Sequence, residues 1–283
     1  MDTTTADVIE NLGQSTIHHG PFNRRIYLMK LHPGDMPGII DELLLLAERN
    51  AYTKITAKVG AQHTQAFLAA GFRHEACLPG FYPDGADAFY MALFLDPSRA
   101  DIFRPKTVVK VINTALRKPC NEPSRQPPAG LTFRELGEPD APAMAALYGR
   151  VFATYPFPIM DPGYLIETMR SHIFYYGLAI DDRLVALASM ETDKDNAVVE
   201  MADFATESGA RGAGAAGFLL GQMEQAGLDK GFRFAFTIAR STSFGMNIAF
   251  ARAGYLYSGT MVNNTNIAGN TESMNMWYRR LST

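Results

Sequence analysis

A short glycine-rich segment is the part of this sequence whose residue types point most directly to chemistry. It reads Arg-Gly-Ala-Gly-Ala-Ala-Gly over residues 211–217, between an apolar run typical of a strand and a run with helical spacing. Glycine lets backbone N–H groups approach a ligand, and the N-terminus of a helix favours negative charge. We therefore expect a phosphate or pyrophosphate group at this loop, rather than a plain turn packed against a sheet.

Two nucleotide-binding patterns overlap in this loop. Gly212, Gly214 and Gly217 match G-x-G-x-x-G, the dinucleotide fingerprint. That fingerprint should open a long alternating β/α domain and be followed by an acidic residue at the end of the next strand. The next predicted strand instead ends in Ile-Ala-Arg at residues 238–240, and the chain upstream of the loop is a predicted hairpin. The dinucleotide interpretation is therefore the weaker one.

The second pattern is Arg-x-x-Gly-x-Ala, formed by Arg211, Gly214 and Ala216. It resembles the acyl-CoA pyrophosphate loop of the GCN5-related N-acetyltransferase superfamily, and the predicted element order from Leu131 to Leu281 is similar to the fold of that superfamily. The resemblance implies acetyl-CoA as co-substrate and no metal. It implies a cofactor-binding site formed by Phe204, Ala205, Thr206, Arg211, Gly212, Ala213, Gly214, Ala215, Ala216, Ser243, Asn247 and Phe250.

Other segments resemble the β-lysine N-acetyltransferase family, and this resemblance covers nearly the whole chain. The segments lie at residues 79–82, 155–159, 200–206, 237–240, 245–247, 254–255, 263–267 and 272–275. The family implies acetylation of the ε-amine of β-lysine to give Nε-acetyl-β-lysine, a compatible solute used in osmoprotection.

Two carboxylates precede the glycine-rich loop. The acceptor amine must lose a proton before it can attack a thioester, because a lysine-type ammonium has a pKa of about 10.4. In the superfamily a strand carboxylate in this position often serves as the base, and Glu200 lies in the matching place with Asp203 on the same strand. Strict alternation would put them on opposite faces, but a β-bulge could bring them together. One acid then deprotonates the amine while the other holds a second ammonium; a surface or salt-bridged acid is the alternative for each.

The resemblance places the oxyanion donor at a backbone N–H near Phe204 or Ala205. The usual general-acid tyrosine is replaced by Phe250, which cannot donate a proton, so Tyr255, Tyr257, Ser243 or water remain as candidates. Of these we select Tyr255 as the catalytic candidate. The usual asparagine of the same helix is displaced as well, because Ser243 stands in its place and Asn247 follows one turn later.

Polar and aromatic residues elsewhere in the second half are candidates for binding a small amine substrate. Arg240 could pair with a substrate carboxylate, and amide side chains between the last two predicted strands could bind carboxylates or amines without fixed charge. A turn rich in residues that tolerate left-handed backbone is the alternative for the amide cluster. The predicted substrate-binding set is Tyr155, Phe157, Arg240, Asn263, Asn264, Asn266 and Glu272.

The elements that must position these residues follow from the apolar periodicity. The stretch Lys118–Gly130 is polar and proline-rich and reads as a linker. Residues 131–283 then form the catalytic domain, in the order β-α-α-β-β-β-α-β-α-β-β. We predict strands at 131–136, 174–180, 184–190, 197–206, 232–238, 255–262 and 273–281, and helices at 140–153, 162–171, 214–226 and 244–253.

Residues 1–117 read as a smaller, degenerate version of the second half of this arrangement, because Ala-Gly-Phe at 70–72 matches Ala-Gly-Tyr at 253–255. The alternative is that any αβαβ stretch shows this likeness. We predict strands at 25–31, 54–59, 73–78 and 88–95 and helices at 38–49 and 62–70. Without a glycine-rich loop, this domain would serve packing, dimerisation or one wall of the substrate site. The predicted fold class is α/β (α+β): a GCN5-related acetyltransferase fold with a central mixed, mostly antiparallel sheet flanked by helices, preceded by this domain.

Composition narrows the class of function. Hydrophobic residues make up 47% and charged residues 19%, which predicts a packed core. The net charge of -3 argues against nucleic-acid binding. We expect no signal peptide, no membrane span, two reduced thiols at Cys77 and Cys120 and a cytoplasmic location, and a homodimer is compatible with this interpretation. Two alternatives remain open: an acetyltransferase for a polyamine, another amino acid or a peptide terminus, and a non-catalytic acyl-CoA sensor.

Overall fold

The computed structural model describes residues 7–121, 124 and 126–281. The chain divides into two compact units. Unit 1 comprises Met1–Pro105 and Ser258–Met276, and unit 2 comprises Lys106–Tyr257 and Trp277–Thr283. The predicted linker, Lys118–Gly130, includes residues 122, 123 and 125, which lie outside the described residues.

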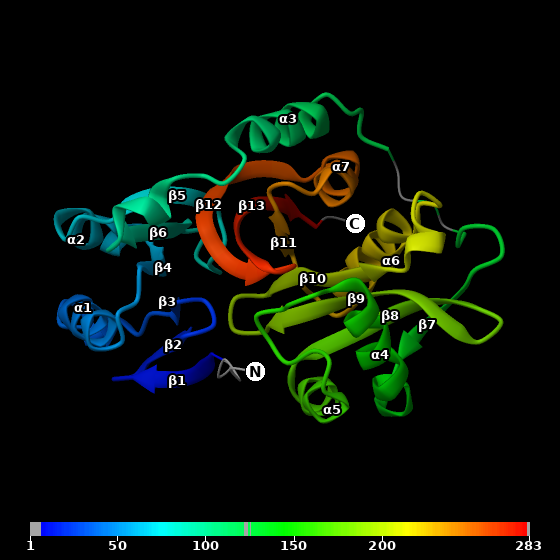
Figure 1. The fold of residues 1–283 in the computed structure, drawn as a ribbon, viewed down its shortest axis with the longest axis horizontal. Helices are drawn as coiled ribbons and strands as arrows, with labels where there is room; N and C mark the ends of the chain where they lie inside the picture. Colours follow the sequence, from blue (N-terminus) through cyan, green and yellow to red (C-terminus); the bar gives the residue numbers. More distant parts are fainter. Residues whose placement is uncertain (1–6, 122–123, 125, 282–283) are drawn as a thin grey trace. The chain divides into compact units, whose positions relative to one another are not determined.

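Unit 1 is a sheet with two helices. Its strands follow the order β1-β2-β3-β4-β6-β5, with β3 and β4 parallel and the other pairs antiparallel. Their bounds are β1 Val8–Leu12, β2 Ser15–Gly20, β3 Arg25–Lys30, β4 Lys54–Gly60, β5 Arg73–Leu78 and β6 Ala88–Phe94. Helices α1 (Ile39–Arg49) and α2 (Thr64–Ala69) connect β3 to β4 and β4 to β5 (Figure 1).

The core of unit 1 forms where the helices cover one face of this sheet. Ile55, Ala57 and Val59 alternate along β4 and are fully buried, as expected for one face of a strand. Leu43 and Ala47, one helical turn apart in α1, belong to the same core cluster. The opposite face of β4 carries Lys54 and Thr56, which are also buried and therefore need polar partners.

Strand β12 (Leu256–Ile267) supplies those partners and pairs antiparallel with β5 at Gly259 opposite Ala76. Lys54 Nζ donates to the carbonyl of Val262 at 2.7 Å and to Glu75 at 2.8 Å, and Thr56 donates to the side chain of Asn264 at 2.9 Å. Strand β13 (Asn270–Arg280) follows β12. The β12 segment of the predicted catalytic domain therefore packs within unit 1.

Unit 2 holds strands that pair in the order β11-β10-β9-β8-β7, in which β10 and β11 are parallel and the remaining pairs antiparallel. The strands are β7 Thr132–Leu136, β8 Ile173–Ile180, β9 Arg183–Asp193, β10 Val198–Thr206 and β11 Phe234–Arg240. The helices are α3 Pro105–Leu116, α4 Ala141–Val151, α5 Pro162–Ser171, α6 Ala215–Asp229 and α7 Phe244–Arg252.

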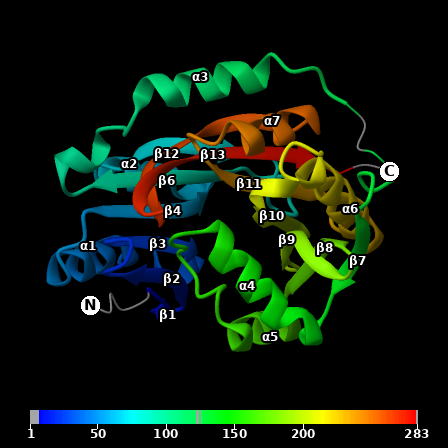
Figure 2. The same ribbon diagram turned by 45° about the vertical axis from the view of Figure 1, so that its right-hand side comes forward.

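Alternation along the strands of unit 2 separates two cores. Tyr175 and Leu187 face one side, where α4 and α5 cover the sheet. Tyr176 and Ala188 face the other side, together with residues of α6 and α7. Figure 2 shows α4 and α5 beside strands β8 and β9, with α6 at the end of β10.

The fold-class prediction is confirmed: the sheet is mixed, mostly antiparallel and flanked by helices. Every predicted strand and helix is present. The sequence analysis missed the β1–β2 hairpin, which turns at Gly13 (φ +62°), and helix α3. The boundary between the two domains, as a division of function, stays a prediction.

The last hairpin is longer than predicted. Strand β12 runs on through residues 263–267, and β13 begins at Asn270. The predicted position of the asparagine cluster between the last two strands is therefore wrong, because these residues lie inside β12. Asparagine has a low strand propensity, but the hydrogen bonds available to these side chains in unit 1 override it.

Candidate active site

A β-bulge interrupts the pairing of β10 with β9. Glu200 lies opposite Glu191 and Ala202 opposite Ser189, but the register then shifts so that Ala205 lies opposite Leu187. At the shift Asp203 has φ +52°, a left-handed conformation that is unusual outside glycine. The bulge that the sequence analysis invoked to bring Glu200 and Asp203 together is present.

Asp203 is buried at this bulge and held by two hydroxyl donors. Tyr155 donates a short hydrogen bond to Oδ1, and Ser189 donates to Oδ2 at 2.7 Å. Burial raises the pKa of Asp203, while the hydrogen bonds from Tyr155 and Ser189 act in the opposite direction. The carboxyl group is thus fixed in position, with a proton affinity above that of an ordinary aspartate.

Glu191 is the acidic residue that the sequence analysis missed. It lies directly opposite Glu200 across the strand pair, so both side chains project from the same face of the sheet. Burial raises the pKa of Glu191 well above its usual value, and the charges of Glu200 and Asp203 raise it further. The detectable signal was a single glutamate within a strand whose preceding residues, 184–190, are apolar or small.

Tyrosines surround this group of carboxylates. Tyr148 lies on α4, Tyr164 on α5 and Tyr175 on β8, and Tyr155 follows α4. Burial raises the pKa of each hydroxyl, and Asp203 and Glu191 raise it further. Tyr155 was predicted to bind substrate, whereas the sequence analysis gave Tyr148 no role in the site.

The glycine-rich loop has the backbone that the sequence analysis required of it. Gly212 and Gly214 both have φ +86°, and Gly214 is the N-cap of α6, which is 15 residues long. A Cβ added at either glycine would meet nothing within 4 Å, so glycine is needed for the left-handed backbone and the space beside it is open. Arg211 Nε donates to the carbonyl of Thr206 at 3.1 Å, and Ala213 precedes Gly214. Ala215 and Ala216 form the first turn of α6.

Strands β10 and β11 separate on the way to this loop. Their paired residues run from Val198 opposite Phe234 to Glu200 opposite Phe236, whereas the strands themselves continue to Thr206 and Arg240. Backbone groups of β10 beyond Glu200, including those of Phe204 and Ala205, are thus outside the registered β10–β11 ladder. This is where the sequence analysis places the oxyanion donor.

The predicted cofactor residues of α7 pack inside unit 2. Phe250 is 1% exposed, with its ring 5.6 Å from those of Phe204 and Tyr255. The Asn247 amide donates to the carbonyls of Arg240 at 3.0 Å and Ser243 at 2.7 Å, and accepts from the Trp277 indole at 2.9 Å. These bonds fix the start of α7, and the binding roles of Ser243, Asn247 and Phe250 stay predictions.

The catalytic candidate Tyr255 lies in a different environment. Its pKa is raised well above the usual value by burial and by the carboxylate of Glu224, while Arg279 acts in the opposite direction. Glu224 lies on α6, and Arg279 donates to it at 3.1 Å. Nothing in this surrounding favours Tyr255 over water as the general acid.

The predicted substrate residues are divided between the units. Tyr155, Phe157 and Arg240 belong to unit 2, where Phe157 packs beside the core of α4 and α5. Asn263, Asn264, Asn266 and Glu272 belong to unit 1, and their substrate roles stay predictions.

The amide side chains in unit 1 have partners within that unit. Asn263 donates to the carbonyls of Arg99 at 2.9 Å and Asp101 at 2.7 Å, and Asn266 donates to the carbonyl of Phe22 at 3.0 Å. The φ of Asn263, +42°, matches the left-handed alternative considered for this cluster.

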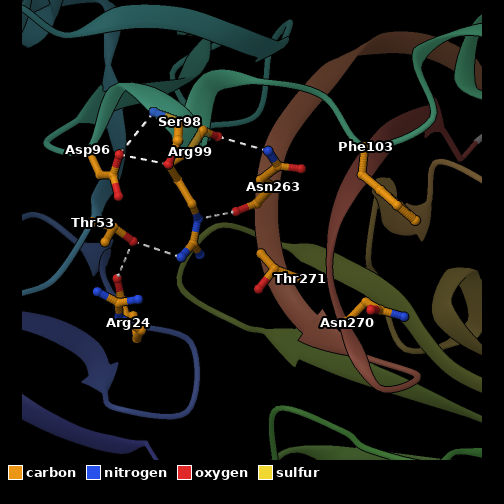
Figure 3. Close-up of a pocket in the computed structure, with 9 residues that line it drawn as sticks. All are labelled: Arg24, Thr53, Asp96, Ser98, Arg99, Phe103, Asn263, Asn270 and Thr271. Atoms are coloured by element: carbon orange, nitrogen blue, oxygen red, sulfur yellow. Dashed lines mark hydrogen bonds between the residues drawn. The ribbon is translucent and has the colours of Figure 1, made fainter.

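Unit 1 also contains a small polar pocket of about 260 Å³. Figure 3 shows Asn263 on its wall together with Arg24 and Arg99. The Arg99 guanidinium donates to the carbonyls of Asn263 and Asn23 and to the hydroxyl of Thr53. Because these N–H groups donate to protein atoms, one of them in β12, Arg99 stabilises the position of β12.

Three further observations concern the described part of the chain. No group of three His, Cys, Asp or Glu side chains there could hold a metal ion. No helix in residues 7–281 that the structure describes is both long enough and apolar enough to cross a membrane. Cys77 and Cys120 are both free thiols.

The mixed sheet with separating parallel strands and a glycine loop at a helix N-terminus fits the class that the relatives' names give, an N-acetyltransferase. No family model matches the chain. The β-lysine N(6)-acetyltransferase of Methanococcus maripaludis is 37% identical over 271 residues, which cover 96% of this chain and 98% of that protein. The chain belongs to the β-lysine N(6)-acetyltransferase family.

Two other relatives also bear N-acetyltransferase names. The β-lysine N(6)-acetyltransferase of Methanosarcina mazei is 30% identical, covering 75% of this chain and 85% of its own. The N-acetyltransferase YodP of Bacillus subtilis is 30% identical, covering 94% and 96%. Among solved structures, an N-acetyltransferase from Staphylococcus aureus is 16% identical, with a TM-score of 0.48 over 54% of this chain and 100% of that one.

Proposed function

We propose that this protein transfers the acetyl group of acetyl-CoA to the ε-amine of β-lysine, giving Nε-acetyl-β-lysine. The observation that carries the proposal is the buried carboxylate group at the β10 bulge, on the strand that leads into the glycine-rich loop. Two relatives, at 37% and 30% identity, bear the name of this activity.

The residues of the glycine-rich loop fit a pyrophosphate. Gly212 and Gly214 leave open space at the N-terminus of a 15-residue helix, where backbone N–H groups and the helix dipole favour an anion. Arg211, at the entrance of the loop, adds a positive charge. When bound, acetyl-CoA supplies the activated acetyl group. The protein positions the amine beside this group and accepts a proton from the amine.

Glu200 is the proposed base. The ε-nitrogen loses a proton to this carboxylate, directly or through water, and its lone pair forms the N–C bond to the acetyl carbon. The nitrogen, now bonded to the acetyl carbon, gives up its second proton, which passes through water to the coenzyme thiolate that leaves as the C–S bond breaks. A backbone N–H near Phe204 or Ala205 donates to the carbonyl oxygen while negative charge develops on it. Asp203, fixed by Tyr155 and Ser189, orients the acceptor.

The test is to identify the product. The purified protein, given acetyl-CoA and β-lysine, should release coenzyme A with one equivalent of acetylated product. Two-dimensional NMR should show the acetyl group on the ε-nitrogen. Acetylation of the β-nitrogen, or no thiol release with β-lysine while another amine reacts, would overturn the proposed acceptor.

A further inference from the structure

The carboxyl group of Glu191 has no ion-pair partner in the described part of unit 2. In the described chain no hydrogen-bond donor and no cation pairs with its carboxyl group, whereas Arg150, Arg170 and Arg183 pair with other acids. The groups that face it are all acidic or neutral: the carboxyls of Glu200 and Asp203 and the hydroxyls of the surrounding tyrosines, Tyr148, Tyr155, Tyr164 and Tyr175.

A second, independent observation lies on the facing helix. The hydroxyl of Tyr148 on α4 is fully buried and has no hydrogen-bond partner. The strongest electrostatic neighbour of this hydroxyl is Asp203, followed by other members of the same group, including Glu191. Leaving a buried hydroxyl without a hydrogen-bond partner costs free energy. The Tyr148 oxygen and the unpaired carboxyl of Glu191 lie on the same face of the sheet, and both lack a hydrogen-bond donor.

An alkylammonium group supplies that complement. It brings one positive charge and three N–H donors, which match two carboxylates and one hydroxyl oxygen. We propose that Glu191, Asp203 and Tyr148 form a subsite for the ammonium group of the acceptor that is not acetylated. The inference rests on the proposed function and deepens it, because it adds Glu191 and Tyr148 to the acid that was expected to hold the second ammonium of the acceptor.

The arrangement also explains why such a site selects its substrate. When the site is empty, burial raises the pKa of both Glu191 and Asp203, and the neighbouring carboxylates raise that of Glu191 further, so these two groups bind protons more strongly than ordinary carboxyls. An entering ammonium favours the ionised form and expels a proton. An acceptor without this ammonium leaves the Glu191 carboxyl and the Tyr148 oxygen unsatisfied, which is the kind of mismatch that gives strong discrimination.

The test compares two acceptors that differ by one group. β-Lysine is 3,6-diaminohexanoate, and 6-aminohexanoate has the same carboxylate and the same distal amine but no β-ammonium. In wild type, kcat/KM should be at least about tenfold higher for β-lysine. Glu191→Gln should lower kcat/KM for β-lysine about 10–100-fold and change that for 6-aminohexanoate less than threefold. Glu191→Asp should restore part of the preference, and Glu167→Gln, which removes an exposed acid from α5, should leave it unchanged.

Binding gives a readout that does not depend on turnover. Calorimetry with coenzyme A present, in buffers of different ionisation enthalpy, should show more protons released for β-lysine than for 6-aminohexanoate. This difference should disappear in Glu191→Gln. Tyr148→Phe should weaken β-lysine binding without lowering the Tm, because it removes a hydroxyl that has no partner in the free protein.

The outcomes are distinguishable. An unchanged preference in Glu191→Gln overturns the ammonium subsite, and so does an equal loss for both acceptors, which would make Glu191 a base or a structural residue. If wild type acetylates neither acceptor, the proposed function fails. In that case the calorimetric difference between the two acceptors is the test of the subsite, and its absence in wild type overturns the subsite.

Discussion

At the scale of residues, proton transfer by Glu200 can be tested through pH. Glu200→Gln keeps the shape of the side chain and removes its basicity, so kcat should fall about 10²–10⁴-fold. The loss should shrink as pH rises towards the pKa of the amine, because free amine then becomes available without a base. The control is Glu135→Gln, which changes an exposed carboxylate on β7 and should have no effect. A defect below tenfold that does not vary with pH would move the role to Asp203 or to water.

The partly buried carboxyl of Glu191 also predicts a stability effect with a definite sign. Its folded-state pKa is raised, mainly by burial, so the unfolded chain releases this proton at lower pH than the folded protein does. Wild-type stability is therefore lost as pH rises above the ordinary glutamate pKa of about 4.3.

Glu191→Gln removes this linkage. The Tm of the variant should exceed that of wild type by a few degrees at pH 8, and the two should converge near pH 4.5. Scanning calorimetry at both pH values measures the difference. A variant less stable than wild type at pH 8 would contradict the unpaired, partly buried setting of Glu191.

Residue types and spacing were enough to select Glu200, Asp203 and the glycine-rich loop as candidate site residues, because they lie on one strand and in the turn after it. The proximity of Glu191 and Tyr148 to Asp203 could not be predicted this way, although a lone glutamate after an apolar run was a detectable signal for Glu191 itself. Their relation to Asp203 depends on the register between β9 and β10 and on the face that α4 covers, and a single sequence specifies neither.

At the scale of elements, the start of α6 should decide acetyl-CoA binding. Gly214→Asp places a carboxylate where backbone N–H groups are expected to bind the pyrophosphate, so affinity for acetyl-CoA should fall at least tenfold. The matched control is Gly231→Asp. Gly231 follows the same helix, has the same φ of +86° and has equally open surroundings.

Both variants suffer the same backbone strain of about 1–2 kcal/mol, but only the change at Gly214 should reduce affinity. Isothermal titration of acetyl-CoA into the two proteins provides the comparison. If both proteins are folded and bind acetyl-CoA with equal affinity, the assignment of the pyrophosphate to this loop is wrong.

Periodicity predicted the strands and helices of unit 2 well because their apolar faces are long and regular. It failed at Asn263–Asn266, where strand β12 is stabilised by side-chain hydrogen bonds to residues far away in sequence. It also missed β1, whose residues are almost all exposed, so the strand has no apolar alternation to detect.

At the scale of the whole molecule, the stability of unit 1 should depend on a buried ion pair. Lys54 and Glu75 are 2.8 Å apart, with side chains 0% and 2% exposed, and Glu75 also accepts from the backbone of Val262 at 2.8 Å. Lys54→Met leaves the Glu75 carboxylate buried and unpaired, which should cost about 3–5 kcal/mol.

The double variant Lys54→Met/Glu75→Gln serves as the control. It retains no uncompensated charge and should recover part of the lost stability. Urea unfolding measures all three proteins. If the single and double variants have the same midpoint, the ion pair does not hold β12 in unit 1.

Other properties of the whole molecule, namely homodimer formation, a cytoplasmic location and the functional division into two domains, stay predictions. The packing of Ser258–Met276 within unit 1 was not detectable from the sequence. Linker composition marks where a chain is polar, but not which strand later in the chain returns to the first unit.

The central claim concerns the acceptor, and specificity constants test it most directly. With acetyl-CoA saturating, kcat/KM should be highest for β-lysine, lower for α-lysine and lowest for spermidine, which lacks a carboxylate. A value for spermidine equal to or above that for β-lysine would contradict the account of the acceptor site.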